Sequence, residues 1–289
     1  MSKAKLALIS SMAIFATIGI FRKFISLPSG TVAMARAVVG TIFLVVLMLI
    51  RGKKISFDSI KKNAIPLCLS GVFLGFNWIL LFEAYNYTTV ATATLCYYMA
   101  PVILILISPI AFKEKLTLPK LLCVAVAVGG MTLVSGTFSS NEQGTDNIKG
   151  VFLGLCAALF YAAVVTCNKK LKDIEAFDRT TVQLGISAIV LVPYTFLLED
   201  FSGVTLNAST TILLIVVGVI HTGVAYALYF GCMDKLNTQT VALYSYIDPV
   251  GAVLLSALLL KEPMGIPEII GAVLVLGATL TSEFVDRRR

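Results

Sequence analysis

Apolar segments of about 20 residues, each long enough for an α-helix to cross roughly 30 Å of hydrocarbon, recur from one end of this chain to the other. Hydrophobic residues make up 58% of the 289 residues and charged residues only 13%, whereas roughly a quarter of an ordinary soluble domain is charged. The mean hydropathy is +0.92. We therefore predict an all-α polytopic membrane protein with no separate soluble domain.

Glycines, prolines and charge clusters mark where the predicted membrane helices begin and end. No small-residue cleavage site follows the first apolar run, so we interpret this run as a retained helix and not as a cleaved leader. Ten transmembrane helices are predicted, near residues 5–22, 31–50, 63–84, 89–112, 117–137, 148–168, 179–198, 209–232, 238–260 and 264–284.

Basic residues predict how these helices are oriented, because loops rich in Lys and Arg stay on the cytoplasmic side. Most of the 23 Lys and Arg residues fall on the side that holds the N-terminus, whereas the opposite side holds Arg22, Lys23, Lys149 and Lys261. We therefore expect a multi-pass protein of the cytoplasmic membrane with both termini in the cytoplasm. The net charge of +7 belongs to these loops and not to a polar domain face, so we expect no nucleic-acid partner.

The chain resembles itself at an offset of 148 residues, without gaps over three helices. The aligned pairs are Gly75 with Gly223, Trp78 with Tyr226, Phe82 with Phe230, Tyr98 with Tyr246, Pro101 with Pro249, Lys113-Glu114 with Lys261-Glu262, Pro119 with Pro267, and Gly129 with Gly277. We therefore predict two repeats, residues 1–138 and 148–289, joined by a polar loop at 139–147 on the outer side.

Each predicted repeat holds five helices. Because five is an odd number, the second repeat must enter the membrane from the opposite side, so the repeats are inverted. Inverted repeats are a recurring design of secondary transporters, whose substrate site lies near the membrane midplane between the halves.

In these features the chain resembles the drug/metabolite transporter superfamily and, within it, the ten-helix EamA-type carriers. The resemblance rests on the repeat length, on Tyr-x-x-Pro at 98–101 and 246–249, and on Lys-Glu at 113–114 and 261–262 before a fifth helix. It covers essentially the whole chain and implies alternating access through a central cavity lined by both repeats. Members carry amino acids, sugars, drugs, amines and cofactor precursors, so it implies no particular substrate. Asp248 departs from the pattern, because many members have an apolar or small residue there.

Asp248 is the sharpest functional candidate, because an ionisable group inside a span costs at least about 2.5 kcal/mol at the bilayer centre. It precedes Pro249, and Pro101 is the equivalent proline of the first repeat. Both prolines are predicted to break their helices and expose carbonyl groups. Asp248 would contact a cationic substrate or hold a coupling proton. The alternatives are an ion pair with Arg36 or a hydrogen bond to a nearby tyrosine that only fixes the packing.

Three further ionisable residues are candidates for coupling or gating. Arg36 has a planar guanidinium that can bind a carboxylate or phosphate, but its place near a helix end favours a side chain that reaches water. His221, the single histidine, can shuttle protons, although a hydrogen bond to a neighbouring helix is the favoured interpretation. Glu83 lies near the end of its span, where water solvates it.

Aromatic and amide side chains are predicted to line the substrate site. Trp78, Tyr98, Tyr226 and Tyr246 occupy repeat-related positions, and aromatic walls with hydroxyl groups suit amines and zwitterions. Packing or an interfacial belt is the alternative for such residues. Asn77 adjoins Trp78 and would bond either to substrate or to a neighbouring helix.

These observations favour a secondary carrier that moves a small polar metabolite, an amino acid or a related compound, with export as the expected direction. Uptake or proton-coupled exchange of a cationic amine or drug is the alternative, favoured if Asp248 faces the cavity and has no arginine partner. A channel or an intramembrane enzyme is disfavoured, because the sequence has no ring of like charges and no nucleophile or metal constellation. A missing P-loop argues against a pump. We expect no cofactor and no metal. The expected partners are lipid, the substrate and protons as coupling ions. The protein would be a monomer or a homodimer.

Overall fold

The computed structural model describes residues 2–53, 55–113, 116–134, 146–201, 206–233, 235–236 and 238–287, and in these residues the regular structure is entirely helical. In the first half the helices are α1 (Lys3–Lys23), α2 (Ser29–Ile50), α3 (Phe57–Lys62), α4 (Ala64–Tyr87), α5 (Val90–Tyr97), α6 (Ala100–Phe112) and α7 (Leu118–Val134). In the second half they are α8 (Asn147–Asn168), α9 (Ala176–Leu198), α10 (Ala208–Gly218), the π-helix η1 (Val219–Val224), α11 (Ala225–Met233), α12 (Thr238–Ser245), α13 (Ile247–Leu259) and α14 (Ile266–Arg287).

The predicted segments match the observed helices within a few residues, and local capping explains several of the boundaries. Thr89 accepts a hydrogen bond from the backbone N–H of Thr92 (3.0 Å) at the start of α5, and Asn207 accepts one from Thr210 (2.8 Å) at the start of α10. Such side chains satisfy donors that the first turn leaves free. The short helix α3 was not predicted. Glu114 and residues 139–145 of the predicted polar loop lie outside the described residues.

Two of the predicted helices are interrupted at equivalent points. The helix over 90–112 breaks after Tyr97, and the helix over 238–259 breaks after Ser245. Each break lies four residues before a proline, Pro101 or Pro249, because the proline ring clashes with the carbonyl group four residues earlier. The interruptions therefore lie one turn earlier than the prolines themselves.

Both interrupted helices also end in the same way. Lys113 and Lys261 follow α6 and α13 with positive φ angles of 57° and 53°, a left-handed conformation that commonly terminates a helix. The equivalent residues of the two halves thus share a local backbone.

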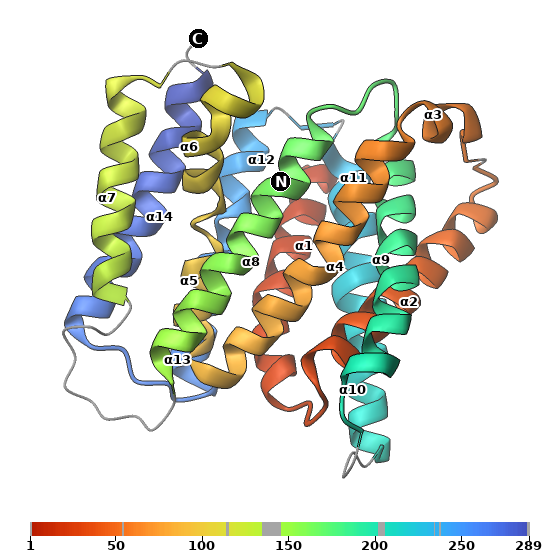
Figure 1. Cartoon of the computed structure of the whole chain (residues 1–289), viewed down its shortest axis with the longest axis horizontal. Coiled ribbons are helices and arrows are strands. Elements are labelled where there is room, and N and C mark those ends of the chain that lie inside the picture. Colours follow the sequence, from red (N-terminus) through yellow and green to blue (C-terminus); the bar gives the residue numbers. More distant parts are fainter. Residues whose placement is uncertain are drawn as a thin grey trace.

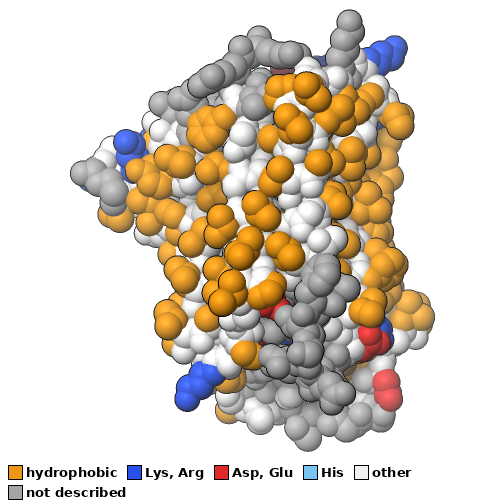
Figure 2. Space-filling model, turned by 90° about the vertical axis from the view of Figure 1, so that its left-hand side faces the viewer, with side chains coloured by type: hydrophobic (Ala, Val, Ile, Leu, Met, Phe, Trp, Pro, Cys, Tyr) orange, Lys and Arg blue, Asp and Glu red, His pale blue; other side chains and the backbone are white. Residues whose placement is uncertain are grey.

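Seven helical stretches of the described chain are long and apolar enough to cross a membrane, one of them the interrupted stretch over 90–112. They are Lys3–Lys23, Ser29–Ile50, Ala64–Tyr87, Val90–Phe112, Asn147–Asn168, Ala176–Leu198 and Ala208–Cys232; three shorter apolar helices cover Leu118–Val134, Leu243–Leu259 and Ile266–Ser282. Figure 2 shows hydrophobic side chains spread over one side of the molecule, with charged side chains mainly towards its two ends. The protein is therefore a multi-pass membrane protein.

The two halves of the chain interdigitate and do not form separate bundles (Figure 1). In the main contacts between them, α4 packs on α8 and α9, α2 on α9, α7 on α14, and α1 on α11 and α13. Glycines allow the closest approaches: a Cβ atom at Gly71 would lie 2.7 Å from Ile186, and one at Gly154 would lie 2.7 Å from Cys96.

The bundle has two ends, which we call upper and lower as they appear in Figure 1. At the upper end α6, α8 and α14 end and α7 begins. At the lower end lie the α1–α2, α4–α5 and α13–α14 connections.

Candidate functional site

Asp248 and Tyr98 meet where the two interrupted helices approach one another. Tyr98 follows the last residue of α5, and its hydroxyl group donates a hydrogen bond of 2.6 Å to Oδ2 of Asp248, in the first turn of α13. Both side chains are only half-buried. Among the described residues, Asp248 makes no ion pair within 4.0 Å. Of the two structural alternatives considered for Asp248, the tyrosine hydrogen bond is present and the ion pair with Arg36 is not.

Tyrosine rings extend from this contact towards α8. The ring centroids of Tyr97 and Tyr98 lie 5.8 Å apart at an interplanar angle of 90°, and those of Tyr97 and Tyr161 lie 5.3 Å apart. We call Tyr97, Tyr98, Tyr161 and Asp248 the Asp248 group. It joins α5, α8 and α13, and it presents hydroxyl groups beside one carboxylate.

Arg36 occupies a second polar position in the bundle, where α2 faces α4 and η1. Its Cζ atom lies 3.9 Å from the ring centroid of Trp78 and 5.9 Å from that of Phe82. Its Nε atom donates a hydrogen bond of 2.9 Å to the hydroxyl group of Thr222. We call these four residues the Arg36 group. Arg36 is 5% exposed, so the interpretation that its side chain reaches water at the helix end is wrong.

The π-helix η1 directs its polar residues at the first half of the chain. Thr222 donates to the carbonyl oxygen of Val217 (3.2 Å), five residues earlier, while accepting from Arg36. His221 lies 2.9 Å from the hydroxyl group of Thr17 in α1 through Nε2. π-helical turns inside α-helices are frequent at functional sites, and here the wider turn places two consecutive residues against two different helices.

The Asp248 and Arg36 groups border the same hydrophobic core cluster. Tyr97 of the Asp248 group is partly buried against the cluster that contains Trp78 and Phe82 of the Arg36 group, and so is Tyr226. Among the described residues, no ion pair within 4.0 Å joins Arg36 and Asp248.

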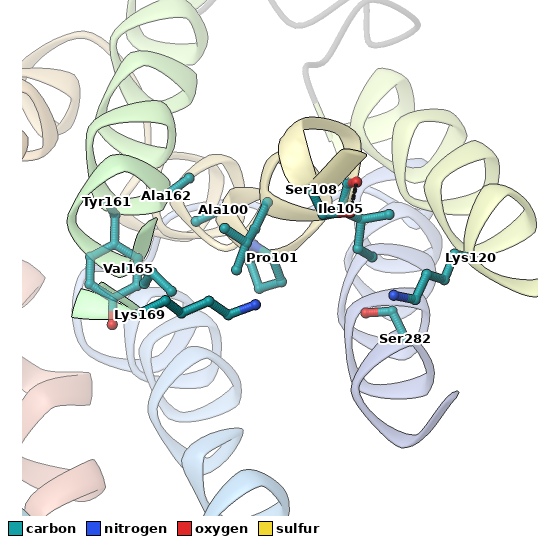
Figure 3. A pocket seen from close by; sticks show the side chains of 11 residues that line it. Ala100, Pro101, Ile105, Ser108, Lys120, Tyr161, Ala162, Val165, Lys169 and Ser282 are labelled. Atoms are coloured by element: carbon teal, nitrogen blue, oxygen red, sulfur yellow. Dashed lines mark hydrogen bonds between the residues drawn. The ribbon is translucent and has the colours of Figure 1, made fainter. Parts of the chain in front are cut away.

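A pocket of about 260 Å³ lies beside the Asp248 group, between α6, α7, α8 and α14 (Figure 3). Tyr161 and Pro101 line it, and Tyr161 belongs to the Asp248 group as well. Lys169 points towards Pro101, whereas Lys120 and Ser282 point towards one another. The pocket therefore extends from Tyr161 towards the upper ends of α8 and α14, where its polar groups are cationic or neutral.

The lower end is held by carboxylates of the second half that accept hydrogen bonds from helix N-termini of the first half. Glu199 accepts from the backbone N–H groups of Gly30 (2.6 Å) and Thr31 (2.8 Å) and from the hydroxyl group of Thr31 (2.7 Å), at the start of α2. Glu262 accepts from the backbone N–H of Val90 (2.8 Å), at the start of α5. Carboxylates are stabilised at helix N-termini by free N–H groups and the helix dipole.

Further polar contacts surround these two carboxylates. Glu262 also accepts from Ser256 and lies 3.5 Å from Nζ of Lys23. Arg22, only 4% exposed, donates to Ser29 (2.9 Å) and Asn86 (3.2 Å). We call Arg22, Ser29, Glu83, Asn86, Glu199 and Glu262 the lower network.

The remaining predicted residues have structural contacts. Glu83 belongs to the lower network, where it accepts from Ser29 (2.6 Å) and Asn86 (3.0 Å). Asn77 is fully buried and donates to the carbonyl oxygen of Ala157 in α8 (2.6 Å). His221 makes the interhelical contact favoured from the sequence. Tyr246 lies at the break between α12 and α13, and Tyr226 packs against Phe15 with centroids 5.4 Å apart.

Sequence reasoning missed Thr222 and Glu199. Thr222 gives no sequence signal, because threonine is common in membrane helices and its role depends on the π-helical register. Glu199 does carry one: a carboxylate that follows the C-terminus of a helix is disfavoured by the helix dipole unless another group binds it. Here that group is the N-terminus of α2.

Known proteins resemble this chain over its whole length. The model of the EamA-like transporter family matches residues 2–136 and again 148–282. The chain is 28% identical to "Uncharacterized transporter YxxF" of Bacillus subtilis over 281 residues, covering 97% of this chain and 89% of that protein. It is 28% identical to "Protein RarD" of Salmonella typhi over 207 residues, covering 71% of this chain and 67% of that protein.

One solved structure, described only as "Crystal structure of protein", superposes with a TM-score of 0.65 at 18% identity. The match covers 100% of this chain and 99% of that one. At this identity the likeness concerns the fold alone.

Proposed function

Because the chain belongs to the EamA-like transporter family, we propose that it is a secondary carrier of the cytoplasmic membrane with ten membrane helices in two inverted repeats. It moves a small polar metabolite, an amino acid or a related compound, by alternating access, and export is the expected direction. Both termini lie in the cytoplasm in this proposal, so the upper end is the cytoplasmic one.

The observation that carries this proposal is the bond between Tyr98 and Asp248. It joins the interrupted helices of the two halves and lies beside a pocket. Broken helices that meet between two halves are where secondary transporters bind their substrates, because the breaks free backbone groups in the bundle interior. A half-buried carboxylate with tyrosine neighbours can bind an ammonium group by hydrogen bonding and by contact with aromatic faces.

The packing of the two halves supports alternating access. α1 packs on α11 and α13, and α8 packs on α4 and α6, so equivalent helices exchange partners between the halves. The lower network ties the halves together at one end, while the pocket lies towards the other. If the repeats are inverted, this conformation has an equivalent counterpart in which the upper end ties the halves together and the pocket lies towards the lower end.

Counterflow tests the proposal. The purified protein in liposomes loaded with an unlabelled amino acid is expected to accumulate the labelled amino acid transiently, and Asp248→Asn is expected to abolish this. Glu175→Gln is the matched control, because Glu175 is an exposed carboxylate whose ion-pair partner is Lys53. Equal flux through Asp248→Asn and the wild type would refute the role of Asp248, and flux that does not saturate would indicate a channel.

Proton-coupled exchange of a cationic amine or drug is the second candidate. The observation that favours it is the missing ion pair between Asp248 and Arg36 among the described residues. The test uses liposomes with a pH gradient. If the protein exchanges amines for protons, addition of an amine should move protons out of the compartment that the amine enters. An amino-acid counterflow that leaves the internal pH unchanged would exclude it.

A further inference from the structure

The pocket between α6, α7, α8 and α14 combines an apolar wall with two cationic side chains. Leu104, Ile105 and Val165 are among the apolar residues that line it, and Lys120 and Lys169 are its charged lining residues. No Asp or Glu occurs among the described residues of the lining. The pocket therefore matches a ligand that has both an apolar portion and an anionic group.

The two lysines approach the pocket from opposite sides. Lys169 follows the last residue of α8 and Lys120 lies in the first turn of α7, and both ammonium groups point into the space between these helices (Figure 3). The Nζ atom of Lys169 lies 4.1 Å from the ring centroid of Phe112. Because an ammonium group has three N–H donors, each lysine can bind an anion in addition to its contacts within the protein.

Lys120 occupies a position that disfavours a cation. Its side chain is only 6% exposed, and burial of an ammonium group carries a desolvation cost. It also lies in the first turn of α7, where the helix dipole favours negative charge and disfavours positive charge. An anion bound in the pocket lowers both costs.

The outer surfaces of the same helices indicate where the anion comes from. Ile110 near the end of α6 is 89% exposed, and Leu118 and Leu122 in the first turns of α7 are 70% and 58% exposed. These apolar side chains can pack against acyl chains. In the proposed orientation this end lies in the cytoplasmic leaflet, where basic pockets between membrane helices bind anionic lipid headgroups.

We propose that this pocket binds an anionic phospholipid of the cytoplasmic leaflet. Lys120 and Lys169 contact the phosphate group of the lipid, and its acyl chains lie along the apolar surface of α6 and α7. This inference rests on the proposed function for its orientation, which puts the upper end in that leaflet. Tyr161 lines the pocket and belongs to the Asp248 group, so the bound lipid lies next to the proposed substrate contacts.

The test compares two lipids that have the same acyl chains. Phosphatidylglycerol is anionic, whereas phosphatidylcholine carries its phosphate beside a quaternary ammonium group that the lysines repel. Each lipid is titrated into the purified protein in detergent, and the rise in Tm gives an apparent affinity, because a ligand of the folded state raises Tm. The wild type is expected to bind phosphatidylglycerol more tightly than phosphatidylcholine.

Lys169→Gln should weaken the apparent affinity for phosphatidylglycerol by about fivefold, the effect of one basic residue near an anionic membrane surface, and leave that for phosphatidylcholine unchanged. Lys169 is exposed, so this variant keeps its packing. Lys120→Gln should have at least the same effect, whereas Lys120→Arg keeps the charge and should keep the preference. Lys62→Gln is the matched control, because Lys62 is an exposed lysine of α3 at the same end and does not line the pocket.

Equal affinities of the wild type for the two lipids would overturn the inference, and so would a Lys169→Gln protein with the wild-type preference. Inorganic phosphate that raises Tm at the same concentrations as phosphatidylglycerol would overturn the lipid as the ligand and indicate a soluble anion.

Counterflow with the same proteins separates this test from the carrier function. A preference for phosphatidylglycerol without saturable counterflow supports the lipid site and refutes the carrier function alone. Saturable counterflow without that preference refutes the lipid site alone.

Discussion

The charged side chains of the lower network have more hydrogen-bond partners than those of the Asp248 and Arg36 groups. At the lower end, Glu199 has three donors from α2, and Glu262 has donors from Val90 and Ser256 together with Lys23. In the bundle interior, Asp248 has one hydrogen-bond donor and Arg36 one acceptor among the described residues. The carboxylates Glu199 and Glu262 at the lower end are satisfied by the protein itself, whereas the interior charges retain binding capacity.

This difference separates a region that holds the conformation from one that can bind a ligand. The lower network connects the two halves through backbone groups at the N-termini of α2 and α5, so the halves cannot move apart there without losing several bonds at once. At the upper end, bonds such as Asn63 to Lys172 (2.8 Å) join α4 to the segment after α8, while a pocket lies between α6, α7, α8 and α14. The predictions below test this contrast.

Cysteine labelling should give the largest effect. In a protein that lacks the six native cysteines, Val165→Cys is expected to react with a polar maleimide many times faster than Leu27→Cys. Val165 lines the pocket, whereas Leu27 is 4% exposed beside the lower network. Mass spectrometry of timed samples gives the rates. Equal rates would show that the lower end is as open as the pocket.

Glu199→Ala should destabilise the protein more than any single change in the Asp248 group. It leaves two backbone N–H groups and a hydroxyl group of α2 without their acceptor, and unsatisfied buried donors cost about 1–3 kcal/mol each. We expect a loss of about 2 kcal/mol in unfolding free energy, seen as a lower Tm in detergent. Glu199→Gln, which keeps an acceptor oxygen, should lose less. An unchanged Tm in the alanine variant would contradict the inference that the lower network holds the two halves together.

Tyr98→Phe should have an intermediate effect. It removes the single hydrogen bond to Asp248 and keeps the ring that contacts Tyr97, so the expected loss of stability is about 1 kcal/mol. Binding of an amino acid should change at the same time, because Asp248 loses the contact that orients it. Tyr194→Phe is a suitable control, since its ring contact with Phe76 stays. A full loss of folding would show that the interior bond, and not the lower network, holds the halves together.

Glu175→Gln should have the smallest effect. Glu175 and Lys53 form an ion pair of 3.0 Å at the upper end, but their side chains are 67% and 51% exposed. Exposed ion pairs contribute about 0–1 kcal/mol, so Tm and counterflow should match the wild type within error. A clear loss would show that cross-half contacts at the upper end matter as much as those of the lower network.

Much of the fold was predictable, because hydrophobic length and proline chemistry act locally. The breaks near Pro101 and Pro249 follow from one clash between a ring and a carbonyl group, and their displacement by one turn follows from the same geometry. The π-helix was not predictable, because its register depends on hydrogen bonds across the bundle. These join Thr17 to His221 and Arg36 to Thr222.

The site was predictable only in part, and Arg36 shows why. Its distance from a helix end suggested that the side chain reaches water, but the direction of a side chain depends on how its helix is tilted and rotated against its neighbours. Likewise Asn77 faces α8 and Glu83 joins the lower network, although both lie in a predicted span beside Trp78.

The sequence by itself determined that this is a multi-pass helical membrane protein of the EamA-like family, because the length of its apolar runs and its repeated motifs are properties of the chain alone. Only the tertiary structure decided which charges are satisfied and which are available. It placed Glu199 on the start of α2, Tyr98 on Asp248, and Trp78 over Arg36. Each of these contacts joins residues distant in sequence, and their geometry depends on how the helices pack.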